Sequence, residues 1–144
     1  HPPLRTKQDL AALRTACQEG LLTGLASYHQ PRTLEEKDGT FNQVTPGMHG
    51  LLTAFPQWVM ALIETKLLDW DQLINLLTHH ARTGMGLPEV QVDLEQPARL
   101  TVFDPHAHYT LDRSAFAGAA ANTPLLGQEL VGRAMATVLP EQVD

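Results

Sequence analysis

The sequence predicts a mixed α/β fold up to about residue 88, followed by a small all-β part. Three patterns lead to this prediction. A helix with a capping signal is followed by a short apolar run at 21–27, which is the order expected of a parallel β/α arrangement. Residues 51–77 are strongly apolar and have helical signals. After Pro88, apolar and polar residues alternate, which is typical of half-buried strands.

The first predicted helix begins after Thr6, because Thr6 can cap its N-terminus while Asp9 completes a variant of the capping box. Apolar residues then recur at helical spacing as far as Cys17, and Gly20 supplies the stop signal. Leu21–Ser27 follows as a short, mostly apolar run. We expect this run to be a buried strand, since the strands of parallel sheets are apolar on both faces.

A long loop is predicted from Tyr28 to Met48, with a turn at Pro46 and Gly47. Loops of this length in compact domains are usually functional or disordered. The next segment, Leu51–Leu68, is apolar nearly all round and predicts a buried helix that is bent or begins again at Pro56.

Asp69 and Gln72 have the spacing of a further capping box, so they predict the start of the next helix. One more helical turn is expected from His79 to Thr83. The part of the chain after Pro88 is predicted to form four strands, at Val90–Leu94, Leu100–Phe103, Tyr109–Leu111 and Leu130–Val138. This change of character divides the chain into residues 1–88 and residues 89–144.

Composition excludes several classes of protein. The formal net charge of -6 and the scattered basic residues argue against a nucleic-acid surface. The single cysteine, Cys17, excludes an internal disulfide framework and fits a reducing compartment. No apolar stretch has the length of a membrane span, and the N-terminus has no secretory signal. We therefore expect a cytoplasmic protein that binds neither nucleic acid nor membranes. Because the first residue is His1 rather than Met, we also expect a piece of a longer polypeptide.

Five groups of motifs then stand in order along the chain: Pro2-Pro3-Leu4-Arg5; His29-Gln30-Pro31 with Glu35-Glu36-Lys37; Thr53-Ala54-Phe55-Pro56; Leu100-Thr101-Val102-Phe103-Asp104-Pro105; and Asn122-Thr123-Pro124-Leu125-Leu126-Gly127. Together they resemble the dihydroorotases of the cyclic amidohydrolase superfamily, which interconvert N-carbamoyl-aspartate and dihydroorotate in pyrimidine biosynthesis. The resemblance implies the last two β/α units of a (β/α)8 metal-dependent barrel at 1–88. It implies strands of a small accessory β-domain at 89–144.

The start of the long loop departs from the family's pattern. The dihydroorotases carry an aspartate that acts as a proton-transferring base at the position of Tyr28, and only His29 is retained in kind. A phenol keeps its proton near neutral pH, so it is a poor general base. Loss of one general base lowers a rate by roughly 10²–10⁴. We therefore expect no catalytic residue in this segment, with Tyr28 as a degenerate position.

The positions that the resemblance implies for substrate binding are also degenerate: His1, Arg5, Arg32 and Gly47. The family has an asparagine in place of His1 and a histidine in place of Arg32. We expect no metal ligand and no cofactor in this segment. Zinc would be bound only if the missing ligands lie elsewhere in a longer protein.

Two other histidine pairs are candidates for metal binding. His106 and His108 would share one face of a strand, but zinc needs three or four protein ligands, so a native site is disfavoured. His79 and His80 are adjacent on a predicted helix and point in different directions, so they are poor chelators.

The resemblance is strongest to inactive dihydroorotase-like chains that associate with aspartate transcarbamoylase. In these pseudoenzymes the aspartate is replaced and His-Gln-Pro follows, as at His29-Gln30-Pro31. The expected partners are aspartate transcarbamoylase subunits and the remainder of the barrel, in a hetero- or homo-oligomer. Two alternatives stay open. One is an active cyclic amidohydrolase whose base and metal ligands lie elsewhere. The other is a small β-domain module with an α/β linker, which the apolar helices disfavour.

Overall fold

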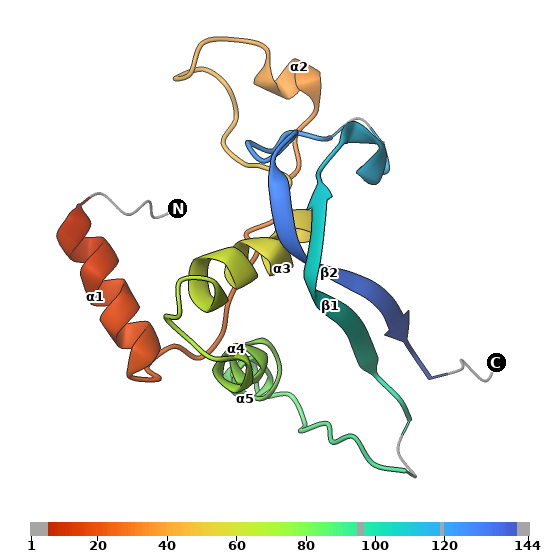
Figure 1. Cartoon of the computed structure of the whole chain (residues 1–144). Coiled ribbons are helices and arrows are strands. Elements are labelled where there is room, and N and C mark those ends of the chain that lie inside the picture. Colours follow the sequence, from red (N-terminus) through yellow and green to blue (C-terminus); the bar gives the residue numbers. More distant parts are fainter. Residues whose placement is uncertain (1–5, 95–96, 119, 141–144) are drawn as a thin grey trace. The chain divides into compact units, whose positions relative to one another are not determined.

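The computed structural model describes residues 6–94, 97–118 and 120–140 (Figure 1). Their elements are, in order, α1 (Lys7–Gln18), α2 (Leu34–Lys37), α3 (Leu51–Trp58), the π-helix η1 (Val59–Ile63), α4 (Trp70–Leu77), α5 (His79–Gly84), β1 (Leu100–Thr110), the 3-10 helix η2 (Arg113–Ala115) and β2 (Glu129–Val138). They form two compact units that alternate along the chain. The first holds α1, α4 and α5, and the second holds α2, α3, η2 and both strands. The predicted division at residue 88, between two β/α units and a β-subdomain, stays a prediction.

The first helix of the first unit begins at its predicted cap. The Thr6 hydroxyl accepts a hydrogen bond from the Asp9 N–H at 3.1 Å, and the Asp9 carboxylate accepts one from the Thr6 N–H at 2.8 Å. Cys17, near the end of α1, is only 5% exposed and packs with Leu68 and Leu76. Burial raises the pKa of the Cys17 thiol, so this cysteine is a structural residue.

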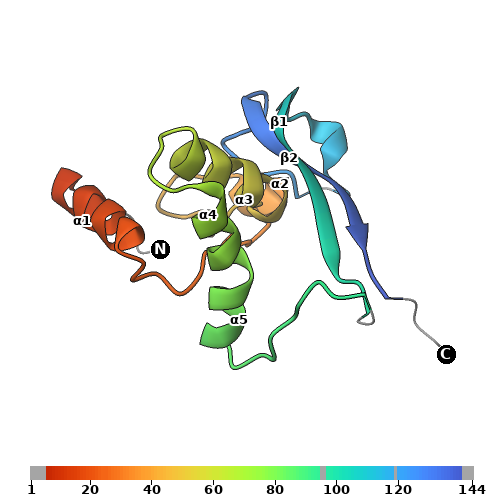
Figure 2. The same ribbon diagram turned by 60° about the horizontal axis from the view of Figure 1, so that its bottom comes forward.

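Helices α4 and α5 confirm the predicted helical segments after residue 68. The Asp69 carboxylate accepts a hydrogen bond from the Gln72 N–H at 2.8 Å, and the Gln72 side chain accepts one from the Asp69 N–H at 3.0 Å. This reciprocal box fixes the start of α4, whose Leu73 is fully buried. Figure 2 shows α5 following directly from α4, with Thr78 between them.

Two predicted strands, Leu21–Ser27 and Val90–Leu94, do not form. Both segments lack regular secondary structure. Leu21 is 67% exposed and Val92 is 84% exposed, whereas Leu22 and Leu25 are partly buried against the cluster that contains Cys17. The apolar pattern of a strand is not sufficient, because a strand also needs a neighbour with which to exchange backbone hydrogen bonds. Over the described residues the sheet has two strands, β1 and β2, which pair with each other.

The predicted helix at 51–68 forms as α3 followed directly by η1. Pro56 lies inside α3, and the helix neither stops nor restarts there. Proline has no N–H to donate and its ring crowds the preceding turn. The wider π-helical turn, which begins at Val59, lies just after this proline.

Strands β1 and β2 form an antiparallel ribbon, with Leu100 opposite Val138 at one end and Thr110 opposite Glu129 at the other. The sequence predicts two separate strands within β1, with a break at Asp104-Pro105, and this break is absent. The register instead shifts between Asp104 and His108, so the ladder passes over a proline that cannot donate a hydrogen bond. The predicted strand at 130–138 is confirmed as β2.

The core of the second unit is built around this ribbon. Its buried apolar cluster consists of Leu111, Phe116, Ala121 and Leu130. Helix α3 packs on β2 (Figures 1 and 2), and the rings of Phe55 and Phe103 meet edge-on at 5.0 Å. Gly132 has a φ of +88°, and a β-carbon there would lie 3.0 Å from the Val59 side chain. A glycine at this position therefore permits the close approach of helix and strand.

None of the helices in the described part of the chain combines the length and the apolar character needed to cross a membrane.

Candidate functional site

The loop at 28–50 belongs to the second unit and begins with an unusual backbone conformation. Tyr28 has a φ of +47°, in the left-handed region that non-glycine residues rarely occupy. Its side chain is 50% exposed. The residue at the degenerate catalytic position is therefore held in a conformation that the rest of the loop must enforce.

His29 caps the N-terminus of α3. Its Nδ1 atom accepts hydrogen bonds from the N–H groups of Gly50 at 3.2 Å and Leu51 at 3.1 Å. Gly50, the residue before α3, has no side chain that could cap the helix. His29 thus supplies, from the other arm of the loop, the hydrogen-bond acceptor that Gly50 cannot provide. An Nδ1 atom that accepts two hydrogen bonds carries no proton, so the imidazole is neutral in this arrangement.

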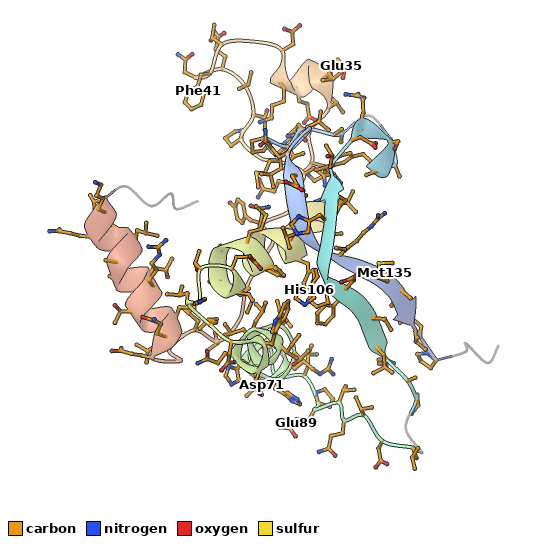
Figure 3. All side chains as sticks on the ribbon, in the orientation of Figure 1. Glu35, Phe41, Asp71, Glu89, His106 and Met135 are labelled. Carbon is orange, nitrogen blue, oxygen red and sulfur yellow. The ribbon has the colours of Figure 1, made fainter. Side chains whose placement is uncertain are left out.

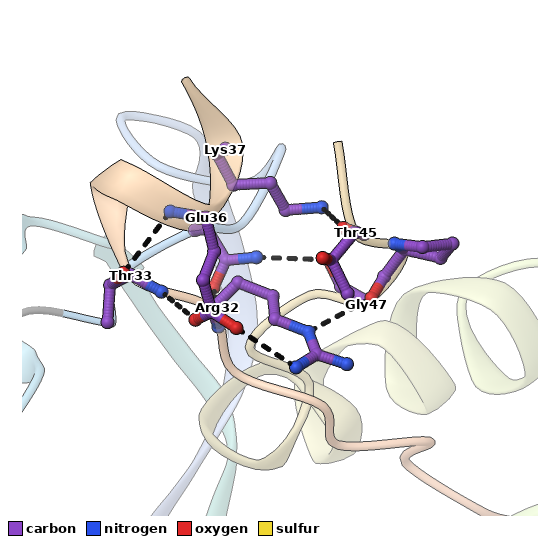
Figure 4. A network of polar contacts seen from close by, with 8 residues as sticks. Arg32, Thr33, Glu36, Lys37, Thr45 and Gly47 are labelled. Carbon is purple, nitrogen blue, oxygen red and sulfur yellow. Dashed lines mark hydrogen bonds and ion pairs between the residues drawn. The ribbon is translucent and has the colours of Figure 1, made fainter. Parts of the chain in front are cut away.

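Arg32 ties the two arms of the loop together (Figure 4). Its Nε atom donates to the Pro46 carbonyl oxygen at 3.0 Å, and its terminal nitrogen lies 3.1 Å from the Glu36 carboxylate. The pKa of Glu36 is lowered, chiefly by the hydrogen bond from the Thr33 backbone N–H and also by Arg32. The Arg32 side chain is 29% exposed, so this residue is a half-buried part of the loop and not a fully solvated turn.

Lys37 and the short helix α2 complete this closure. The Lys37 Nζ atom donates to the Thr45 carbonyl oxygen at 2.7 Å (Figure 4). Thr33 and Glu36 form a capping box that starts α2. At the far end of the loop Phe41 projects outward and is 99% exposed (Figure 3).

Gly47 is placed where its lack of a side chain is required. Its φ is +125°, and a β-carbon would lie 2.7 Å from the Gln30 carbonyl oxygen and 3.2 Å from the Arg32 Nε atom. The loop arms meet here, since the Gln30 N–H also donates to the Met48 carbonyl oxygen at 2.9 Å. Gly47 therefore serves the closure of the loop.

Asn122 joins this loop to the segment before β2. Its Oδ1 atom accepts from the Arg32 N–H at 2.8 Å, and its Nδ2 atom donates to the Gly47 carbonyl oxygen at 3.0 Å. Its own carbonyl oxygen accepts from the His49 N–H at 2.9 Å. Asn122 belongs to the last of the family motifs, Asn122-Thr123-Pro124-Leu125-Leu126-Gly127, and the sequence alone does not indicate this joining role.

His49 is the residue that the sequence analysis missed. Its ring meets that of His29 edge-on, with centroids 4.4 Å apart, and meets that of Phe116 at 4.7 Å. Its Nδ1 atom is buried without a hydrogen-bond partner. Burial lowers the pKa of His49, and the neighbouring His29 lowers it further. The signal in the sequence is weak: a histidine directly before a glycine and an apolar helix.

The structure thus brings four of the predicted positions into one loop: Tyr28, His29, Arg32 and Gly47. His1 and Arg5 lie outside the described residues. The polar groups of His29, Arg32 and Asn122 are engaged in holding the loop together. These contacts fix the backbone of the loop at 28–50, and Tyr28 is the first residue of that loop.

The described residues contain no group of three or more His, Cys, Asp or Glu side chains that could hold a metal ion. His106 and His108 are both exposed on β1, and the His108 Nδ1 atom lies 3.2 Å from the Glu129 carboxylate. His79 and His80 are exposed at the start of α5. Any metal would need ligands from outside the described part of the chain.

The chain is similar to dihydroorotases over nearly its whole length. It is 32% identical to the dihydroorotase of Geotalea daltonii over 143 residues, which are 99% of this chain and 33% of that relative. It is 38% identical to the dihydroorotase of Brevibacillus brevis over 127 residues, which are 88% of this chain and 30% of that relative. It is 34% identical to the dihydroorotase-like protein of Pseudomonas aeruginosa over 138 residues, 96% of this chain and 32% of that relative. No family model matches the chain.

The fold is similar to that of solved hydantoinases. D-hydantoinase (dihydropyrimidinase) from Thermus sp. superposes with a TM-score of 0.79 at 20% identity, over 96% of this chain and 31% of that one. The chain is thus similar to dihydroorotases in sequence and to hydantoinases in fold. The predicted fold class is confirmed, because the helices and strands of this chain match the fold of one part of a hydantoinase barrel protein. The chain spans about a third of the length of the curated relatives it matches.

Proposed function

We propose that this chain is the C-terminal segment of a dihydroorotase-like protein of pyrimidine biosynthesis, non-catalytic at its loop. The observation that carries the proposal is Tyr28. This exposed phenol stands where the resemblance implies a carboxylate base, and proton transfer near neutral pH requires a group that is ionised there. We further propose a structural role as partner of aspartate transcarbamoylase in the cytoplasm.

The contacts of the loop support the non-catalytic role. His29, the neighbour of Tyr28, uses its Nδ1 atom to cap α3. Arg32, at a position of substrate contact in the resemblance, is bonded to Pro46 and Glu36. These side chains stabilise the loop itself, and a group committed in this way is a poor candidate for binding substrate.

The partner role rests on the resemblance to inactive chains of this kind. One similar protein, that of Pseudomonas aeruginosa, has the name dihydroorotase-like protein, which fits this class. The first test is co-purification of the intact protein with aspartate transcarbamoylase from the same organism. A stable complex in size-exclusion chromatography is expected, and two separately eluting proteins would contradict the partner role.

A second candidate is an active cyclic amidohydrolase that hydrolyses dihydroorotate to N-carbamoyl-aspartate. It is favoured by the relatives named dihydroorotase, from Geotalea daltonii and Brevibacillus brevis. In this case the base and the ligands of a zinc ion would come from a part of the protein outside the described residues.

An assay of ring opening and ring closure on the intact protein with added zinc separates the two candidates. The proposal expects no turnover in the wild type and none in Tyr28→Phe, which keeps the ring but removes the hydroxyl. Tyr28→Asp is the matched variant, because it restores the carboxylate at a backbone position that aspartate tolerates. Turnover by the wild-type protein would overturn the non-catalytic assignment, and its loss in Tyr28→Phe would assign the chemistry to the phenol.

A further inference from the structure

Two imidazole rings are in edge-on contact where the loop at 28–50 meets the N-terminus of α3. The His29 and His49 rings are 4.4 Å apart between centroids and nearly perpendicular, with an interplanar angle of 81°. On its other side the His49 ring meets the buried ring of Phe116 at 4.7 Å. The three rings are thus linked by edge-on contacts that join the loop to Phe116 in the core of the second unit.

The contact between His29 and α3 requires an unprotonated Nδ1 atom. That atom accepts from the first N–H groups of the helix, at Gly50 and Leu51. A proton on Nδ1 would turn the acceptor into a donor and set a positive charge against the positive end of the helix dipole. Protonation of His29 and capping of α3 therefore exclude each other.

His49 resists protonation for a second reason. Its Nδ1 atom is buried and has no hydrogen-bond partner. A proton taken up by Nδ1 places a charge on a buried atom beside His29, which agrees with the direction of the pKa shift of His49. Opening of the loop would expose the buried His49 Nδ1 atom to water. The His29 side chain is already exposed, but its Nδ1 atom is occupied by the two helix N–H groups.

The charged groups around the pair do not compensate such a charge. Helix α3 has no ionisable side chain. Within the loop, Glu36 is paired with Arg32. Asp112, the residue before η2, accepts hydrogen bonds from Ser114 and lies next to Arg113 in sequence. Among the described residues neither imidazole has a carboxylate as an ion-pair partner.

We propose that His29 and His49 form a pH-sensitive latch that holds residues 28–50 on the N-terminus of α3 when both rings are neutral and releases them when the rings are protonated. The latch fixes the strained backbone at Tyr28, since His29 is its immediate neighbour. It does not depend on whether the protein is catalytic, so it stands or falls separately from the proposed function.

Hydrogen exchange of the Gly50 and Leu51 amides in the intact protein tests the latch. We expect slow exchange at about pH 8 and a rise below about pH 6 after correction for the intrinsic rate, because each proton taken up on opening changes the opening constant by up to about tenfold per pH unit. With two imidazoles the steepness approaches about a hundredfold per unit.

Two variants isolate the two rings. His29→Asn keeps an acceptor near the Nδ1 position but cannot be protonated, and His49→Phe keeps an aromatic ring at residue 49. Each variant should lower the pH dependence of the opening constant by the equivalent of one proton. In the double variant the opening constant should not depend on pH. His79→Asn and His80→Asn, at exposed positions of α5, are the matched controls and should keep the wild-type profile.

A wild-type profile without pH dependence would overturn the proposal. Unchanged steepness in both single variants would do the same. If His29→Asn does not fold, the profile of His49→Phe decides alone: loss of one proton supports the latch, and full wild-type steepness contradicts it.

Discussion

Tyr28 keeps a backbone conformation that its side chain disfavours. At a φ of +47° a residue with a β-carbon is strained by about 1–2 kcal/mol, and asparagine tolerates this region better than tyrosine. The Tyr28 side chain is also half exposed, so its removal sacrifices little packing. We expect Tyr28→Asn to raise the free energy of unfolding by about 0.5–1 kcal/mol, measured by urea denaturation of the intact protein. Tyr28→Phe keeps an aromatic side chain, which disfavours this φ as tyrosine does, and should be neutral. A gain of equal size in that variant would contradict the explanation by strain.

Gly47 tests whether the arms of the loop meet as closely as the structure indicates. Gly47→Ala places a β-carbon 2.7 Å from the Gln30 carbonyl oxygen, in addition to the unfavourable φ of +125°. Gly118→Ala is the matched control, because Gly118 has a φ of +104° but no atom near the added carbon. We expect Gly47→Ala to lose about 2 kcal/mol or more of unfolding free energy relative to that control, from overlap alone. Equal losses in thermal or urea unfolding would show that the close approach is absent.

Cys17 gives a prediction about pH. Burial raises the pKa of its thiol above the ordinary value of 9.0, so the folded state favours the neutral form. Its contribution to stability is therefore complete below pH 9.0 and is lost as the pH rises through the folded-state value. The thiolate is the reactive form, so alkylation by iodoacetamide at about pH 8 should be slower in the folded protein than in urea. Equal rates would contradict a buried thiol.

At the level of elements, Asn122 carries the connection between the loop at 28–50 and the segment before β2. Asn122→Ala removes the acceptor of the Arg32 N–H and the donor to the Gly47 carbonyl oxygen. Leaving two half-buried backbone groups without these partners should lower the free energy of unfolding by about 1–3 kcal/mol.

The control for Asn122 is Asn42→Ala, because Asn42 also bonds through its side chain, to Thr40, but on the exposed tip of the loop. Urea denaturation should show a change within about 0.5 kcal/mol for that variant. A similar loss in both variants would mean that Asn122 is not the joint between loop and sheet.

The same elements show what could be predicted from the sequence. The helix starts at Thr6 and Asp69 were predicted correctly, because a capping box is formed by residues three positions apart. The prediction of a strand at 21–27 was wrong. The apolar pattern describes side chains, whereas a strand forms only when a neighbouring strand accepts and donates its backbone hydrogen bonds. His49 was missed for a related reason: its ring is positioned by His29 and by the distant Phe116, and no local pattern records such a contact.

At the scale of the whole molecule, both units present apolar side chains to solvent. The exposed set includes Leu10 and Leu13 of α1, Leu51 and Leu52 of α3, and Val102, Met135 and Val138 of the ribbon (Figure 3 labels Met135). Single exposed apolar residues are normal on a monomer, but neighbouring ones on a helix or a sheet face mark surfaces that associate. Segment 21–27 was predicted to be a strand but pairs with no strand in the described residues. Its unpaired backbone groups are a further site for association.

We therefore expect the 144-residue chain on its own to self-associate and to bind a hydrophobic dye such as ANS. Analytical ultracentrifugation over a range of concentrations should show species larger than 15.8 kDa, because burial of these surfaces is favourable in water. Replacing Leu51 and Leu52 together by Gln should weaken association. Val92→Gln serves as the control, since Val92 is 84% exposed in an irregular segment. A monodisperse chain of 15.8 kDa that does not bind the dye would show that these side chains need no partner surface.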